Sequence, residues 1–255
     1  MKVRILGCGT STGVPKIGNH WGQCDPAEPR NARLRSSILV ESAGVNVLVD
    51  CGPDLRQQLL TARIGRIDAV VVTHDHGDHV HGIDELRPLS QALDGPVPLY
   101  GSEETLASLQ YRFAYAFAQT EFYRPIVDAR EIAGEERFGS AVVRFVGQPH
   151  GSGSSLGMRF DESGHSFAYA IDFNKLSEDM ARLYEGVDVW VADCLTRQKH
   201  PTHAHLDGVL GWARDLKVGQ LYLTHMGNGL DYQGLVAELP DWAAPAHDGL
   251  EIELT

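Results

Sequence analysis

Residues 74–79 group the side-chain types that bind divalent metal ions. The segment contains His74, His76, Asp78 and His79, and it directly follows the apolar run Ala69–Val72, which predicts a strand. Imidazole nitrogens and carboxylate oxygens are the ligands that zinc and similar ions prefer in proteins. Functional side chains collect at strand ends, because rigid scaffold meets loop there. A solvated polar turn would not need three imidazoles in six residues, so the segment predicts a metal site.

Three further candidates share one feature: each comes after a short apolar run that predicts a strand. They are His150 after Val142–Val146, Asp172 after Ser166–Ile171, and His225 after Leu221–Thr224. Taken singly, each is more typical of a hydrogen-bonded loop histidine or of a turn or capping aspartate than of a metal ligand. Their shared position at strand ends favours a common role, because the six-residue cluster cannot complete two metal sites by itself.

Composition excludes several classes of function. The chain has 255 residues, with 22 Lys and Arg against 34 Asp and Glu, which gives a net charge of -12. So acidic a surface disfavours non-specific binding to nucleic acid or to an anionic membrane. A small phosphorylated substrate stays compatible, because a bound metal ion inverts the local field.

Several features indicate a cytoplasmic protein. No apolar run approaches the roughly 18 residues that span a bilayer. The first ten residues contain no long apolar stretch of a secretory signal. The four cysteines are scattered without a C-x-x-C pair, which is typical of a reducing compartment.

The pattern along the chain predicts one domain over residues 1–255, without internal repeat or linker. Predicted strands are Lys2–Leu6, Ser37–Glu41, Val45–Val49, Ala69–Val72, Val142–Val146, Leu156–Phe160, Ser166–Ile171, Val187–Ala192, Leu221–Thr224 and Gly249–Leu254. Predicted helices are Asp54–Ala62, Glu103–Phe117, Leu176–Tyr184, Asp207–Leu216 and Gln233–Leu239. Strands both pair as hairpins and alternate with helices, which indicates two packed sheets with helices outside.

The motif His74-x-His76-x-Asp78-His79, followed in order by His150, Asp172 and His225, resembles the metallo-β-lactamase superfamily. Further segments resemble its phosphodiesterase branch, in particular the PhnP-like phosphoribosyl cyclic phosphodiesterases. These segments are Gly7–Pro15, Ser36-Ser37, Val49–Pro53, Tyr169–Asp172 and His200–His203. The resemblance covers nearly the whole chain and implies the αββα sandwich of that superfamily, two mixed sheets flanked by helices.

The resemblance also implies a dinuclear site for two divalent ions, Zn²⁺ or Mn²⁺. One ion would be held by His74, His76 and His150, the second by Asp78, His79 and His225, with Asp172 bridging both. Two cations about 3.5–4 Å apart acidify a bridging water to a pKa of about 7, which gives a nucleophilic hydroxide. Asp50, at the end of its own strand, would support the ligands through hydrogen bonds; an ordinary turn residue is the alternative.

His203 and Asp78 are the residues that the resemblance places in catalysis. His203 occupies the position of the family's histidine that binds no metal, where it would assist the leaving group. His205 competes for this role, but its spacing to Asp207–Leu210 favours His203. His205 is therefore kept as a candidate for substrate binding.

Other candidate substrate contacts lie near the amino terminus. Ser11 and Thr12 belong to a glycine-rich turn that we expect beside the metal site. Arg33 and Arg35 form a basic cluster with Arg30, and a forked guanidinium suits a substrate phosphate. The alternative is a solvated loop with local ion pairs.

One departure from the family pattern concerns a structural zinc. PhnP-like enzymes can hold such an ion with an amino-terminal cysteine cluster and a histidine soon after the last ligand. Here that stretch keeps only Cys24, and Asn228 stands where the histidine is expected. The sequence therefore predicts no structural zinc.

Together these features predict a hydrolase that cleaves a phosphodiester of a small or cyclic phosphate, such as phosphoribosyl 1,2-cyclic phosphate. Alternatives are tRNA 3′-end processing, lactone or thioester hydrolysis, and a non-catalytic metal sensor. A homodimer is compatible with the family. The aromatic segment Gln110–Arg124 could form a lid, a dimer face or a packed helix.

Overall fold

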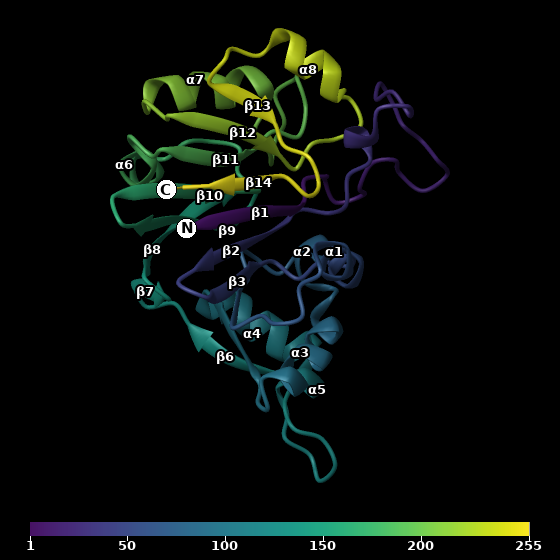
Figure 1. Cartoon of the computed structure of the whole chain (residues 1–255), viewed down its shortest axis with the longest axis vertical. Helices are drawn as coiled ribbons and strands as arrows, with labels where there is room; N and C mark the ends of the chain where they lie inside the picture. The colour runs from purple at the N-terminus through teal and green to yellow at the C-terminus, as the bar shows by residue number, and fades with distance from the viewer. Residues whose placement is uncertain (255) are drawn as a thin grey trace.

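Two β-sheets form the centre of the molecule. The computed structural model describes residues 1–254, and each sheet has seven strands. From edge to edge, the first sheet consists of β14 (Glu251–Glu253), β1 (Lys2–Gly7), β2 (Ser37–Ser42), β3 (Val45–Val49), β4 (Ala69–Val71), β5 (Val97–Gly101) and β6 (Val127–Glu131). The second consists of β13 (Ala243–Pro245), β12 (Gln220–Thr224), β11 (Val189–Asp193), β10 (His165–Ala170), β9 (Gly153–Glu162), β8 (Ala141–His150) and β7 (Glu135–Phe138). In Figure 1 the two chain ends lie close together, where β14 pairs with β1.

Helices cover the outer faces of the sheets, which confirms the predicted αββα sandwich. The α-helices are α1 (Leu55–Ala62), α2 (Gly77–Val80), α3 (Arg87–Ala92), α4 (Glu103–Arg112), α5 (Ala114–Phe117), α6 (Glu178–Tyr184), α7 (Leu206–Asp215) and α8 (Tyr232–Glu238). Short 3₁₀ helices occupy Pro29–Asn31 and Ile83–Leu86. None of these described helices combines the length and apolar character that crossing a bilayer requires.

Successive residues along a strand of the first sheet pack into two different hydrophobic cores, one on each face of the sheet. In β2, Ile38 and Val40 pack between the sheets, whereas Leu39 packs among the helices on the outer face. Leu48 of β3 and Leu55 of α1 belong to that same outer core. Because both faces of these strands are covered, the strands read in sequence as unbroken apolar runs.

Strand direction brings the candidate residues to one edge of the sandwich. β3 runs parallel to β4, and β10, β11 and β12 run parallel to one another. β8 is antiparallel to β9, which is antiparallel to β10, so β8 and β10 point the same way. The carboxyl ends of neighbouring parallel strands meet at the same edge, and every predicted metal ligand follows or ends one of these strands.

Several elements differ from the prediction. β8 and β9 form a long hairpin, so His150 is the last residue of a strand rather than a loop residue. The hydrophobic pattern of the sequence does not predict β5, β6, β7 and β13. These strands are short and contain proline or several charged residues. The predicted helix Glu103–Phe117 breaks at Phe113 into α4 and α5.

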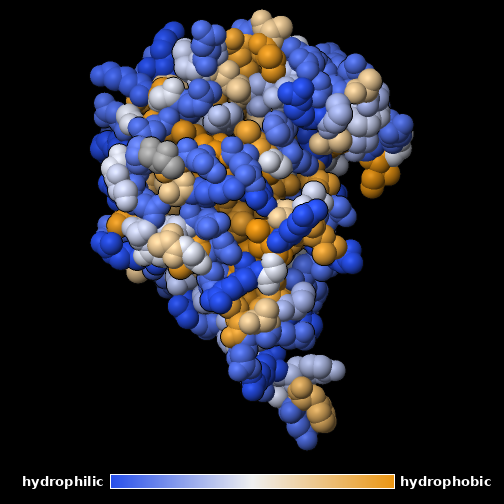
Figure 2. Space-filling model, in the orientation of Figure 1, coloured by the Kyte–Doolittle hydropathy of each residue, from blue (hydrophilic) through white to orange (hydrophobic). Residues whose placement is uncertain are grey.

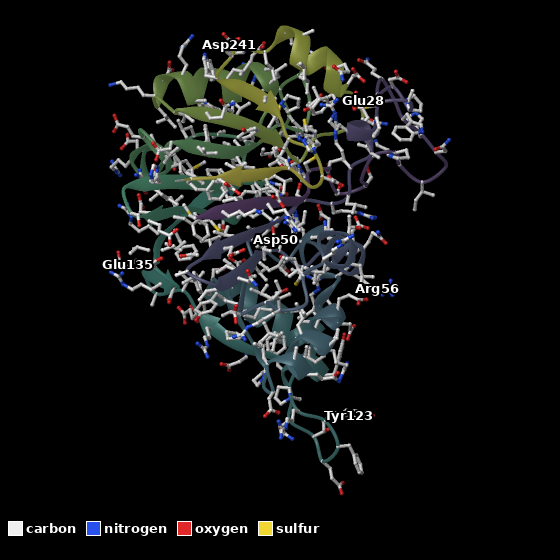
Figure 3. The ribbon with its side chains drawn as sticks, viewed as in Figure 1. Glu28, Asp50, Arg56, Tyr123, Glu135 and Asp241 are labelled. Carbon is white, nitrogen blue, oxygen red and sulfur yellow. The ribbon has the colours of Figure 1, made fainter. Side chains whose placement is uncertain are left out.

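The aromatic segment Gln110–Arg124, which begins at the end of α4, is only partly packed. Leu109 and Ala116 are buried, but Tyr111 is 88% exposed and Phe122 is 81% exposed. The loop that follows α5 projects from the lower end of the molecule in Figures 1 and 2, and Tyr123 lies on this projection in Figure 3. A packed helix therefore does not describe the whole of Gln110–Arg124.

Gly52 allows the loop after β3 to touch the segment that carries Asp78. A Cβ added to Gly52 would lie 2.0 Å from the backbone oxygen of Asp78. We expect Gly52→Ala to lower the free energy of unfolding by about 1–3 kcal/mol, because the backbone must shift. Gly65→Ala, where an added Cβ meets nothing within 4 Å, should stay within about 0.5 kcal/mol of the wild type. Urea denaturation measures both, and equal midpoints for the two variants would contradict this account.

Candidate metal centre

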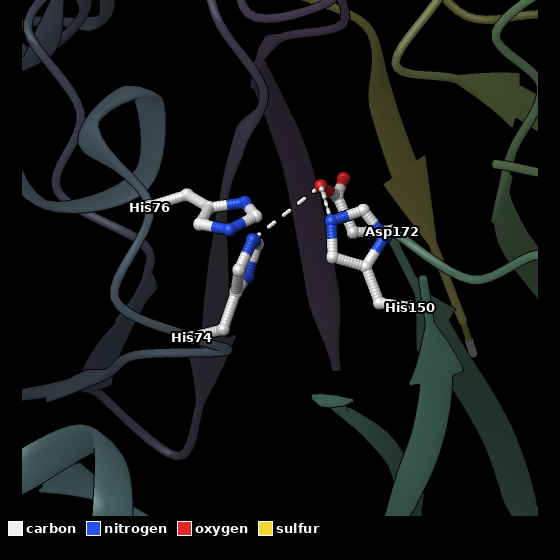
Figure 4. Close-up of side chains that lie close together, drawn as sticks. All are labelled: His74, His76, His150 and Asp172. Carbon is white, nitrogen blue, oxygen red and sulfur yellow. Dashed lines mark ion pairs between the residues drawn. The ribbon is translucent and has the colours of Figure 1, made fainter. Parts of the chain in front are cut away.

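The loop after β4 faces the second sheet across the edge of the sandwich. Figure 4 shows His74 and His76 on one side, with His150 and Asp172 on the other. One oxygen of Asp172, Oδ2, lies 3.4 Å from Nε2 of His74 and 3.4 Å from Nε2 of His150. Together with His76, these side chains offer four ligand atoms within 4.8 Å of one another. This spacing can hold a metal ion.

A second group adjoins the first. Asp78, His79 and His225 also offer ligand atoms within 4.8 Å of one another. The other oxygen of Asp172, Oδ1, lies 3.4 Å from Nε2 of His225 and 3.7 Å from Nε2 of His79. The Asp172 carboxylate thus presents one oxygen to each group, which is the arrangement of a bridging ligand.

A third group overlaps these two and includes a residue that the sequence analysis missed. It consists of Asp172, Asp193, His203 and His225. Nδ1 of His203 lies 3.0 Å from Oδ2 of Asp193, which is a hydrogen bond. Asp193 ends the apolar strand β11 at the same edge, so the rule that selected Asp172 and His225 could have found it.

Three of the residues at this edge follow their strands in a left-handed conformation. The φ angles are +64° for Asp50, +54° for Asp172 and +57° for His225. Few residues other than glycine adopt such angles, although aspartate and histidine tolerate them better than most. This turn bends the chain directly after the strand and costs energy, which the surrounding packing must offset.

Asp50 connects the two predicted metal groups through hydrogen bonds. Its Oδ2 atom lies 2.7 Å from Nδ1 of His79 and accepts the hydroxyl proton of Thr73 at 2.9 Å. Because the single hydroxyl proton goes to Asp50, Oγ1 of Thr73 accepts from Nδ1 of His74, at 3.1 Å. The carboxylate therefore fixes His79 directly and His74 through Thr73.

These hydrogen bonds determine which ring nitrogens remain for a metal. Nδ1 of His150 donates to the backbone oxygen of Thr202 at 2.8 Å, just as Nδ1 of His79 donates to Asp50. Among the described residues, the buried Nε2 atoms of His74, His79 and His225 have no hydrogen-bond partner. Buried polar atoms are rarely left unpaired, so these lone pairs and the carboxylates around them fit divalent cations.

The match to a known family covers this whole site. Residues 45–226 match the model described as the Beta-lactamase superfamily domain, and this range contains all seven predicted ligands. The chain belongs to the beta-lactamase superfamily. Its fold is that of the superfamily's metal-dependent hydrolases, so the predicted resemblance is confirmed.

The similarity to individual relatives covers different shares of their length. A crystal structure described as a new diphosphatase from the PhnP family is 35% identical, with a TM-score of 0.88 over 98% of this chain and 96% of that one. Octanoyltransferase of Porphyromonas gingivalis is 30% identical over 98% of this chain. Ribonuclease Z of an Exiguobacterium species is 32% identical over 48% of this chain. The chain spans only 51% of the octanoyltransferase, and the match covers 39% of the ribonuclease Z.

Electrostatics keep the carboxylates of the superfamily site ionised. Burial raises the pKa of Asp172, but the charges of His225 and His79 hold it well below its usual value. For Asp78, the adjacent imidazoles of His225 and His79 outweigh burial in the same way and lower the pKa. Burial lowers the pKa of His225, yet Asp172 and Asp193 raise it to about 10. A metal ion would take the place of such protons, because imidazole binds metal only when deprotonated.

Asp75, between the first two ligand histidines, points away from the metal groups. Its carboxylate accepts hydrogen bonds from Ser108 and Arg112 of α4. Nη2 of Arg112 also contacts Nε2 of His81 at 2.8 Å. Helix α4 therefore braces the loop that carries the ligands.

Arg33, a candidate for binding a substrate phosphate, is buried and hydrogen-bonded within the chain. Its exposed fraction is 2%, and its guanidinium donates to the backbone oxygens of Gly227 at 3.2 Å and Leu230 at 2.7 Å. Cys24 packs beside it and donates its thiol proton to Leu230. Arg33 thus ties the amino-terminal loop to the segment after His225.

The other amino-terminal candidates are also engaged within the chain. The Arg35 guanidinium pairs with Asp54 at 2.9 Å and donates to the backbone oxygen of Ser11 at 3.2 Å. Thr12 donates its hydroxyl proton to Gly13. Ser11 and Thr12 are exposed, and neither lines a hollow beside the metal ligands. Local ion pairing, the alternative considered for this cluster, describes Arg35.

Two hollows flank the segment that carries His203. The first, of about 460 Å³, adjoins His74, His76 and His150 and is lined by several serine hydroxyls. The second, of about 670 Å³, is lined by His200 and Pro201 and includes His205. His205 therefore lies outside the metal groups, in the second hollow.

Asp50→Asn tests the supporting role of that carboxylate. Asparagine replaces one of the two accepting oxygens with an NH2 donor, so it cannot accept all the hydrogen bonds that His79 and Thr73 donate to the carboxylate. We therefore expect metal affinity to fall about 10–100-fold. Competition with a chromophoric chelator measures this loss. Asp128→Asn, at an exposed position of β6, is the matched control and should retain wild-type affinity. Wild-type affinity in a folded Asp50→Asn protein would show that Asp50 does not orient the ligands.

Proposed function

We propose that this chain hydrolyses phosphodiester bonds of small substrates, including cyclic phosphates, with two divalent metal ions. The observation that carries the proposal is the Asp172 carboxylate shared by two groups of metal-binding residues, with His203 beside them. Similarity to a PhnP-family diphosphatase over nearly the whole chain supports phosphorus chemistry. Zn²⁺ and Mn²⁺ both suit the mixed imidazole and carboxylate ligands.

The proposed ligands follow from the geometry. His74, His76 and His150 would hold one ion, Asp78, His79 and His225 the other, and Asp172 both. When bound, the two ions supply a hydroxide at neutral pH and neutralise charge on the phosphoryl oxygens. Asp50 keeps the rings of His74 and His79 turned toward the ions through the hydrogen bonds described above.

His203 is the proposed proton donor. Its ring lies between those of His150 and His225, with centroid distances of 5.0 Å and 4.9 Å. Asp193 accepts the Nδ1 proton, so Nε2 is the nitrogen left for reaction. In the imidazolium form, the Nε2 proton passes to the leaving alkoxide as the bond from phosphorus to the leaving oxygen breaks. Asp193 stabilises the imidazolium and orients the ring.

Hydrolysis of bis(p-nitrophenyl) phosphate tests the proposed chemistry. Protein reconstituted separately with Zn²⁺ and with Mn²⁺ should release p-nitrophenolate with at least one metal. His76→Ala removes one ligand and should abolish the activity. Two bound ions per chain without hydrolysis would overturn the proposal in favour of lactone or thioester substrates or of a metal sensor. Cleavage of precursor tRNA alone would favour the RNA-processing alternative.

The roles of His203 and Asp193 are tested together. We expect His203→Ala to lower kcat about 10²–10⁴-fold for a cyclic nucleotide, whose leaving group is an alkoxide, with metal content retained. The loss for bis(p-nitrophenyl) phosphate should be much smaller, because p-nitrophenolate leaves without a proton. Asp193→Asn should lower kcat as well, and the double variant should be no slower than His203→Ala, because Asp193 acts through His203. Fully additive losses, measured alongside metal content, would contradict this coupling.

A further inference from the structure

Two aspartates at the metal centre are each contacted by the hydroxyl of one buried serine. Oγ of Ser155 lies 2.8 Å from the backbone oxygen of Asp172 and 2.9 Å from that of the preceding residue. Oγ of Ser37 lies 3.0 Å from the backbone oxygens of Asp50 and of the residue before it. We call each arrangement a serine clasp. We propose that Ser155 and Ser37 are positioning residues, whose clasps set the direction of the two carboxylates before any metal ion binds.

A serine clasp restrains both backbone torsions of its aspartate. The two carbonyl oxygens belong to the planar peptide groups before and after the aspartate Cα atom, so one hydroxyl beside both restrains φ and ψ together. The φ angles are +54° for Asp172 and +64° for Asp50, and such angles cost energy outside glycine. Because the side chain leaves from the same Cα atom, a fixed backbone also fixes the direction of the carboxylate.

Ser155 is itself held by a chain of hydrogen bonds that begins at α6. Nε2 of Gln148 lies 2.9 Å from Oγ of Ser155 and 2.9 Å from the backbone oxygen of Ile171. Oε1 of Gln148 accepts the hydroxyl proton of Tyr184, the last residue of α6, at 3.1 Å. Gln148, Ser155 and Tyr184 are all buried, so water does not compete for these hydrogen bonds.

The donors and acceptors of this chain match in one direction. A carbonyl oxygen only accepts, so the Gln148 amide donates one proton to the backbone oxygen of Ile171 and its other proton to Oγ of Ser155. The single hydroxyl proton of Ser155 is then left for the backbone oxygen of Asp172. Tyr184 therefore supports the conformation of Asp172 through two intervening side chains.

Strand β9 leaves space for this hydrogen-bond chain and contacts both sides of the metal centre. A Cβ atom added to Gly157 of β9 would overlap with Oη of Tyr184. Glycine inside a strand often marks such a close approach. The backbone N–H of Leu156, the neighbour of Ser155, donates to the backbone oxygen of Thr73 at 2.9 Å. Adjacent residues of β9 thus hold the ligand loop of the first sheet and the bridging aspartate of the second.

The two clasps act on different parts of the centre. Asp172 presents one oxygen to each metal group, whereas Asp50 orients histidines of the first sheet. Loss of the Ser155 clasp should therefore disturb both metal groups, and loss of the Ser37 clasp should act through the imidazoles that Asp50 holds. This inference rests on the metal centre of the proposed function and is independent of the substrate.

Hydrogen exchange of the metal-free protein, followed by NMR, tests the Ser155 clasp directly. The backbone amide of Asn174, two residues after Asp172, donates to the backbone oxygen of Pro149 at 3.1 Å. Ser155→Ala leaves a buried carbonyl oxygen without its donor, so exchange at Asn174 should become faster on the order of tenfold or more. Tyr184→Phe removes only the far end of the hydrogen-bond chain and should speed the same exchange by a smaller factor.

Two further variants serve as matched controls. Ser37→Ala should speed exchange at Cys51, whose hydrogen-bonded amide directly follows Asp50, and should leave Asn174 unchanged. Ser166→Ala removes another buried, hydrogen-bonded serine hydroxyl, near the opposite end of the strand that precedes the bridging aspartate. It should change exchange at neither amide.

Binding of Mn²⁺ tests whether the clasp matters to the ligand. Ser155→Ala should bind Mn²⁺ on the order of tenfold more weakly in competition with a chromophoric chelator, because the ligand is no longer held in its binding conformation. The electron paramagnetic resonance spectrum should lose the coupling between two ions that a shared carboxylate supports. Ser166→Ala should match the wild type in both measurements.

The outcomes separate this inference from the proposed function. Unchanged exchange at Asn174 in Ser155→Ala would overturn the inference, as would faster exchange with wild-type affinity for Mn²⁺ or equal effects of Ser155→Ala and Ser166→Ala. If Ser155→Ala does not fold, the same two measurements on Tyr184→Phe decide. If the wild type binds one ion per chain, weaker binding of that ion by Ser155→Ala still supports the clasp, while the two-metal proposal fails.

Discussion

The structure depends on one buried carboxylate, that of Asp172, which contacts histidines from both sheets. A buried charge is costly unless oppositely charged or hydrogen-bonding groups surround it. His74 and His79 come from the first sheet, whereas His150 and His225 come from the second. The carboxylate therefore finds its partners only when the two sheets pack with their edges aligned, and divalent cations would strengthen this same arrangement.

Hydrogen bonds from surrounding residues restrain the metal-binding side chains around Asp172 and the loops that carry them. Asp50 restrains two imidazoles of the first sheet, and Asp193 restrains His203 beside the second. Arg112 and Ser108 hold the loop between the ligands from α4, while Arg33 holds the segment after His225. Charged side chains that first suggest substrate binding thus serve largely to fix the backbone, because a site of precise geometry needs rigid neighbours.

The two hollows beside the segment that carries His203 differ in their lining. One offers hydroxyls and carboxylates, and the other offers lysines and imidazoles. The exposed side chain of Tyr123 lies on the loop that projects beyond α5. The exposed side chain of Tyr111 lies on α4, the helix that also contributes Ser108 to the hollow lined by hydroxyls.

The sequence by itself predicts the αββα sandwich and the seven candidate metal ligands, because buried strands appear as apolar runs and His74–His79 forms one local motif. It also points to Asp50 and His203, through position at a strand end and through resemblance. Asp193 obeys the same strand-end rule and was missed. Only the tertiary structure decides which groups the long cationic side chains contact. Arg33 turns inward to backbone oxygens, whereas Lys175 and Lys199, 24 residues apart, line one hollow. Local sequence patterns determine whether a segment forms a helix or a strand, but the partner of a side chain depends on contacts between distant segments.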